Sequence, residues 1–77
     1  MMFASHGRTF DAGRQAVQFY GYDGAKQWPF FVTAETLRRM HPMMVHSEAG
    51  MLEAFDSNQN LICAMASKLY AWSHGES

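Results

Sequence analysis

The clearest pattern in the chain is an alternation of apolar and polar positions over residues 16–32. Two runs rich in β-branched and aromatic residues, 16–22 and 25–32, flank the dipeptide Asp23-Gly24. Asp-Gly is typical of a two-residue type I′ turn, because both central positions of that turn need a positive φ. The pattern therefore predicts an antiparallel β-hairpin.

A turn centred on Asp23-Gly24 also predicts the register of the hairpin. Three cross-strand pairs follow from it: Tyr22 with Ala25, Phe19 with Trp28, and Val17 with Phe30. Since side chains alternate between faces, one face is apolar and the other is mixed. The apolar face would carry Val17, Phe19, Trp28, Phe30 and Val32, and the mixed face Gln18, Tyr20, Gln27 and Phe31. Pro29, which has no N–H to donate, then falls at a hydrogen-bonded position. We expect this position to face an open sheet edge, the alternative being a bulge at Gly24 that shifts the register by one residue.

A short helix is predicted over residues 34–40. Thr33 is a suitable N-cap, since its hydroxyl can accept a hydrogen bond from the first turn. Leu37 and Met40 are three residues apart and would face the core. Pro42 would end the helix, because the residue before a proline avoids the α region.

A long amphipathic helix is predicted over residues 48–72, with Ser47 as its N-cap. Apolar residues recur there at steps of three and four: Leu52, Phe55, Ile62, Ala66 and Leu69. The one gap in this spacing, between residues 55 and 62, is filled by the polar Gln59. The polar run 56–60 weakens the pattern, because Asp, Ser and Asn side chains compete for backbone hydrogen bonds. The helix could bend at that run.

Together these elements predict an α+β fold, in which an N-terminal antiparallel hairpin packs on the short helix and the long helix. We expect the 77 residues to form a single domain, with residues 1–9 as a loosely ordered lead-in and Phe10 packing back on the domain. A domain this small buries only about 60% of its unfolded surface. Its one cysteine, Cys63, cannot form an intrachain disulfide. Self-association is therefore one way to gain burial.

Residues that could carry chemistry are scattered. The four histidines are His6, His41, His46 and His74, and no pair has the i, i+4 spacing of a helical zinc site. His41 and His46 flank one connector and could meet, but two ligands make a weak site. Cys63 is predicted on the apolar side of a helix, where a thiol packs rather than reacts. We expect a protein that is not an enzyme and that holds no cofactor and no metal.

The charge of the chain does not favour nucleic acid as a partner. The net charge is −1, with six Lys and Arg residues, whereas nucleic-acid-binding domains normally show a basic stripe. The letters Gly21 to Gly24 match the GxxG loop of KH domains, but here they form the predicted tip of a hairpin. Weak binding through four scattered arginines stays open as an alternative: Arg8, Arg14, Arg38 and Arg39.

The same composition bears on location. No run approaches the ~20 apolar residues that cross a membrane. No secretion signal is visible, and the lone cysteine suits a reducing compartment. We therefore expect a cytoplasmic protein.

Aromatic and methionine side chains are left over once the hairpin and helices are assigned. The chain has seven methionines, a residue that makes adaptable binding surfaces, and Tyr and Phe are enriched at interface cores. The candidate interaction surface consists of Tyr20, Phe31, Met40, Met43 and Met44.

Five segments carry a likeness to known sequences: residues 10–19, 21–24, 29–32, 37–39 and 54–71. With them the chain resembles a family of short bacterial proteins known as domain of unknown function fourteen-eighty-eight. The resemblance covers about residues 10–72. It implies a small α+β fold, a bacterial source and no established activity, and it supplies no functional residues.

We therefore expect a non-enzymatic accessory or protein-interaction module of a bacterial cytoplasm, whose partner is a second copy in a homodimer or an unidentified protein. The main alternative is a small-ligand or minor enzymatic role in a pocket between the hairpin and the helix. His41, His46 or Arg14 would supply the polar groups of such a pocket.

Overall fold

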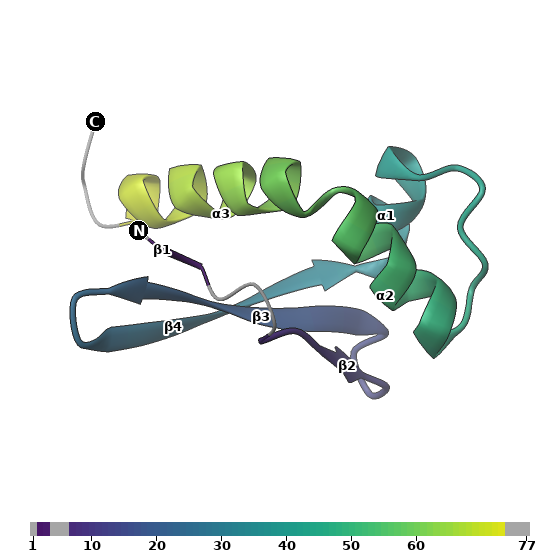
Figure 1. The fold of residues 1–77 in the computed structure, drawn as a ribbon, viewed down its shortest axis with the longest axis horizontal. Coiled ribbons are helices and arrows are strands. Elements are labelled where there is room, and N and C mark those ends of the chain that lie inside the picture. Colours follow the sequence, from purple (N-terminus) through teal and green to yellow (C-terminus); the bar gives the residue numbers. More distant parts are fainter. Residues whose placement is uncertain (1, 4–6, 74–77) are drawn as a thin grey trace.

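The computed structural model describes residues 2–3 and 7–73, which form one antiparallel sheet with helices on one of its faces (Figure 1). The α+β class expected from the sequence is confirmed. The strands are β1 (Met2–Phe3), β2 (Thr9–Asp11), β3 (Ala16–Asp23) and β4 (Lys26–Thr33). The helices are α1 (Ala34–Met40), α2 (Glu48–Ser57) and α3 (Gln59–Ser73).

Strand β3 lies at the centre of the sheet. It pairs with β4 along its whole length, and β1 and β2 pair with different parts of its other side. Met2–Phe3 and Thr9, which the sequence analysis assigned to a lead-in over residues 1–9, thus lie in strands of this sheet. The physical reason is that the second side of a central strand presents N–H and C=O groups that need partners. Phe3 and Phe10 also pack against the core, as expected for Phe10.

The register of the hairpin differs from the prediction by two residues. Phe19 pairs with Phe30, and Asp23 pairs with Lys26 to close the hairpin. The loop is therefore Gly24-Ala25, and Gly24 (φ 63°) occupies its first central position, as in a type II′ turn. The predicted pairs were wrong, but an even shift leaves every side chain on its predicted face.

The shift also removes the conflict at Pro29. Counted from the hydrogen-bonded pair that closes the turn, Pro29 and Tyr20 form the third pair further on, which is non-hydrogen-bonded. The nitrogen of Pro29 therefore points away from β3. Within the described residues β4 has no strand on that side, so the expected open edge is present without a bulge.

Helix α1 has the bounds expected from the sequence. Its N-cap Thr33 accepts a hydrogen bond from the backbone N–H of Thr36, and the chain leaves the helix at His41, whose N–H donates to the carbonyl of Leu37. Leu37 is fully buried, and Met40 packs against the core. The signals that predicted this helix are local, which is why they sufficed.

The single helix predicted over residues 48–72 is in fact two helices, α2 and α3, which meet at an angle (Figure 1). Asn58 separates them. Its side-chain amide donates to the carbonyl of Ala54 (2.9 Å), and its own carbonyl accepts from the N–H of Ile62 (3.0 Å). Asn58 thereby ends α2 and begins α3. The expected N-cap Ser47 is confirmed, since its hydroxyl accepts from the N–H of Gly50.

The core lies between the inner face of the sheet and the helices. Its buried residues are Val17, Phe19, Val32, Ala34, Leu37, Met51, Ala54, Phe55, Ile62 and Ala66. At its centre the ring of Phe19 lies 5.2 Å from that of Phe55, between centroids. Leu69, which the predicted stripe placed in this core, is largely exposed instead. Over residues 59–72, helix α3 thus contributes Ile62 and Ala66 to the buried set.

Candidate interaction surface

Helix α3 carries a row of exposed apolar side chains beside its buried side. Leu61, Met65, Leu69 and Trp72 are exposed to 53%, 41%, 62% and 84%. They are spaced by four, four and three residues, so they lie along one side of the helix. We call these four residues the α3 stripe.

The sequence of α3 explains why the stripe is exposed. Among its fifteen residues only Lys68 is charged, so apolar side chains occupy more of its circumference than one core can cover. A typical surface helix turns a charged face to water, opposite its apolar stripe. In α3 part of the face turned to water is apolar.

The far end of α3 is held to the hairpin tip by a different side of the helix. The hydroxyl of Tyr70 donates to the carboxylate of Asp23 (2.5 Å), and its ring lies 5.5 Å from the ring of Trp28. These contacts orient α3 along the hairpin (Figure 1). The α3 stripe is therefore presented by an anchored helix.

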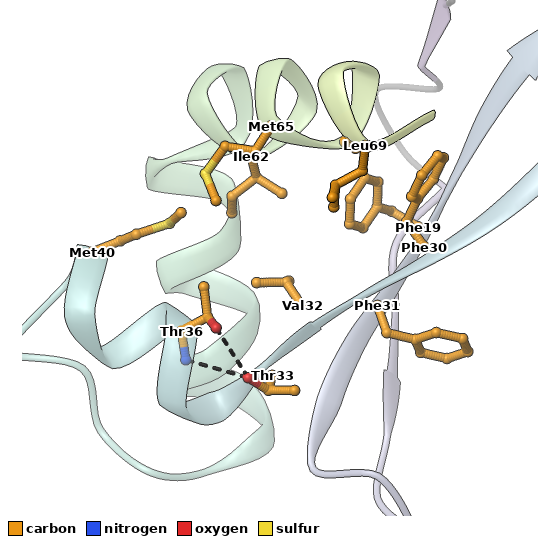
Figure 2. Close-up of a pocket in the computed structure, with 11 residues that line it drawn as sticks. Phe19, Phe30, Phe31, Val32, Thr33, Thr36, Met40, Ile62, Met65 and Leu69 are labelled. Carbon is orange, nitrogen blue, oxygen red and sulfur yellow. Dashed lines mark hydrogen bonds between the residues drawn. The ribbon is translucent and has the colours of Figure 1, made fainter. Parts of the chain in front are cut away.

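A groove of about 200 Å³ runs beside the α3 stripe, between α1, α3 and β4 (Figure 2). Its lining residues are mainly apolar: Phe19, Phe30, Phe31, Val32, Thr33, Thr36, Met40, Ile62, Met65, Ala66 and Leu69. The hydroxyls of Thr33 and Thr36 are hydrogen-bonded to each other (3.2 Å). Since Met65 and Leu69 belong to both features, the groove and the α3 stripe form one continuous apolar region.

The five residues proposed from the sequence as an interaction surface lie in two places. Tyr20 and Phe31 are on the outer face of the sheet, where the guanidinium of Arg14 lies 4.5 Å from the centroid of the Phe31 ring. Met40 and Met44 are half-buried against the core, whereas Met43 is exposed in the connector after α1. Their role in binding stays a prediction.

Sequence reasoning did not find the α3 stripe. It placed Leu69 in the core and gave no role to Leu61, Met65 or Trp72. The available signal was the scarcity of charge after residue 58, which leaves α3 with apolar residues outside the predicted inward face.

The polar groups proposed for a ligand pocket do not line the groove. His41 is the C-cap of α1, and His46 Nε2 lies 3.1 Å from the side-chain oxygen of Gln15. Arg14 is paired with Asp11. His6 and His74 lie outside the described residues. Within residues 2–3 and 7–73, no three His, Cys, Asp or Glu side chains are grouped closely enough to hold a metal ion.

A comparison with family models decides the relationship of the chain. The model of DUF1488, a protein family of unknown function, matches residues 1–76. The chain belongs to the DUF1488 family. The resemblance inferred from the sequence is confirmed, and it extends over essentially the whole chain. No curated protein and no solved structure gives a significant match.

The arginines of this DUF1488 protein are mostly engaged by neighbouring acids. Arg8 makes a bidentate pair with Asp56 (both N···O distances 2.8 Å), and Arg39 pairs with Glu35 (3.0 Å). With Arg14 on Asp11, three of the four arginines proposed for nucleic-acid binding have a carboxylate partner. Because carboxylates partly neutralise these arginines, their pairing disfavours a basic surface for nucleic acid.

Cys63 lies half-buried in α3. Desolvation raises the pKa of its thiol. A thiol with a raised pKa is protonated at neutral pH and is a poor nucleophile. The geometry thus favours a packing role for Cys63. None of the described helices combines the length and apolar character needed to span a membrane.

Proposed function

We propose that this DUF1488 protein is a protein-interaction module that catalyses no reaction, and that the α3 stripe is its binding surface. The observation that carries the proposal is the exposure of four large apolar side chains side by side. Taking about 200 Å² for each such side chain when fully exposed, their exposed fractions amount to roughly 480 Å². The largest apolar patch on a typical monomer measures about 300–600 Å² and is often functional, and the stripe falls in that range.

The composition of the region supports the same role. Interface cores are enriched in aromatic residues and Met and depleted of charge, as this stripe is. Trp72, the most exposed of the four, is of the residue type that most often dominates binding energy. The adjoining groove adds a concave surface that can receive a partner's side chain. We propose a bacterial cytoplasmic setting for the module, with a homodimer as its simplest form.

A small-ligand role has weaker support. Ligand pockets usually measure about 300–1,000 Å³ and contain a few convergent polar groups. The groove is smaller, and its polar side chains are the threonines at positions 33 and 36, which already bond to each other. Burial of an apolar partner surface fits this region better than orientation of a polar substrate.

Site-specific photo-cross-linking in the cells that make the protein tests the proposal. A photoreactive amino acid placed at Leu69 should give a protein adduct of discrete mass. The same amino acid at Glu53, which is exposed on α2 away from the stripe, is the matched control. Absence of an adduct at Leu69, or equal labelling at both positions, would contradict an interaction role for the α3 stripe.

A further inference from the structure

We propose that the partner of the α3 stripe is a second copy of this chain. Two α3 helices would pack antiparallel across a two-fold axis that passes close to Met65. The inference rests on the proposed interaction role of α3 and adds the identity and geometry of the partner. Four features of the described residues favour this arrangement.

The first feature is the symmetry of the stripe. Leu61 and Leu69 lie four residues before and four residues after Met65. This part of the α3 stripe therefore has the same residue types at the same spacing when the direction of the helix is reversed. A two-fold interface requires this property, because each contact between two positions must occur twice. In the antiparallel arrangement Leu61 of each copy meets Leu69 of the other, and the Met65 side chains meet at the axis.

The second feature is area. If pairing covered the stripe completely, the roughly 480 Å² exposed in each copy would give roughly 1,000 Å² of buried surface in total, which is about the lower limit for a specific interface. This figure counts only Leu61, Met65, Leu69 and Trp72. The backbone and polar side chains around them add to it. No further element is needed to reach the area of a weak dimer.

The third feature is charge. Helix α3 contains no acidic residue and only one basic residue, Lys68, at the margin of the stripe. A partner with a charged binding face would leave its charges unpaired against this surface, at a cost in desolvation. A second α3 brings an equally uncharged surface. The net charge of −1 per chain adds little repulsion between copies.

The fourth feature concerns the edge of β4, which is another place at which copies could join. An open edge invites strand pairing, but a proline whose nitrogen points outward removes one hydrogen-bond donor from that edge. Pro29 occupies such a position near the middle of β4. Pairing through β4 is therefore disfavoured, which favours the α3 stripe over this edge as the surface for association.

The arrangement predicts a position for Trp72 as well. It lies seven residues beyond Met65, or about 10 Å along the helix axis. Across the two-fold axis, that distance brings Trp72 to the start of α3 in the second copy. Each end of the interface would then be closed by one indole ring.

Cysteine cross-linking of the purified full chain tests this geometry. In a Cys63→Ser background, Met65→Cys places one thiol at the proposed axis and Glu53→Cys places one away from it. Thiols held together in a dimer experience a mM effective concentration, so at micromolar protein Met65→Cys should form the disulfide dimer about tenfold faster or more. Circular dichroism of both variants checks that each is folded.

A second pair of variants covers the case in which Met65→Cys does not fold. Leu61→Cys and Leu69→Cys copies, mixed, should cross-link to each other faster than either cross-links to itself. Equal rates for Met65→Cys and Glu53→Cys, or no preference in the mixture, would overturn the second-copy proposal. In that event, an adduct to a different protein at Leu69 in cells would still support the interaction module, and its absence would remove both.

Discussion

At the scale of single residues, Gly50 shows a packing constraint that helix propensity alone would misjudge. A Cβ atom added there would collide with the backbone carbonyl of Val45, because the connector before α2 folds back over the helix. Alanine normally stabilises a helix interior by about 1 kcal/mol relative to glycine. Here we expect Gly50→Ala to destabilise the fold by about 2 kcal/mol, because the backbone at Val45 must move to make room for the added Cβ. Urea unfolding measures the change.

Gly13→Ala is the matched control for this prediction. A Cβ at Gly13 would meet its nearest atom, a side-chain oxygen of Asp11, at an ordinary 3.5 Å. We expect a change within about 0.5 kcal/mol at this surface position. A stabilised Gly50→Ala variant would show that the connector does not pass close to α2.

A second prediction at this scale concerns pH. The side chain of Arg14 donates to Asp11 (2.7 Å), its backbone N–H donates as well (3.1 Å), and together they lower the pKa of the Asp11 carboxyl. A lowered pKa in the folded state gives stability that is present above the unfolded value of about 3.9 and is lost as the pH falls through the folded value. Arg14→Ala should therefore raise the pKa of Asp11, as NMR titration of its carboxyl carbon can measure. Arg39→Ala, on another ion pair, should leave it unchanged, and equal shifts would contradict the assignment.

At the scale of elements, Asn58 is the residue that turns one predicted helix into two. Its side-chain amide satisfies the carbonyl of Ala54 at the end of α2. Asn58→Ala removes this hydrogen bond and should lower the free energy of unfolding by about 1 kcal/mol. Thermal unfolding of Asn58→Ala beside Asn60→Ala, an exposed position in α3, isolates the effect. Equal losses in the two variants would mean that the capping bond contributes nothing of its own.

The elements differ in how far sequence could predict them. Helix α1 was predicted to the residue because its signals, Thr33 at the start and Pro42 just beyond the end, act locally. The hairpin was predicted on the correct faces but with the wrong turn, because both Asp23-Gly24 and Gly24-Ala25 put glycine where a tight turn accepts it. Strands β1 and β2 are too short to show an alternation, and they form because β3 needs partners on its second side.

At the scale of the whole molecule, the candidate surface depends on the break at Asn58. A continuous helix with the predicted stripe would have placed Leu69 in the core. Because α3 begins anew at Asn58 and is anchored through Tyr70, Ile62 and Ala66 face inward, and the side with Leu61 and Met65 is left uncovered. Apolar spacing predicts that a helix has an inward face, but the direction of a chain after a break is a tertiary property.

The proposed pairing of two α3 stripes would add to the stability of the folded chain. A helix in water is held mainly by tertiary packing, and among the α3 residues whose burial is described two side chains, Ile62 and Ala66, are buried in the chain's own core. Pairing with a second copy would cover the stripe and would stabilise the folded protein in a concentration-dependent way. Oligomeric state is therefore the property on which the second-copy proposal depends most.

Sedimentation equilibrium of the purified chain, between about 10 µM and about 1 mM, measures that property over the range in which a weak dimer forms. We predict that the average mass rises with concentration toward twice that of the chain, and that Met65→Lys, which places two like charges at the axis, stays at the mass of one chain. Glu53→Lys, which adds the same charge outside the stripe, should behave like the unchanged protein. A wild-type protein that has the mass of one chain at 1 mM would contradict a second copy on the α3 stripe.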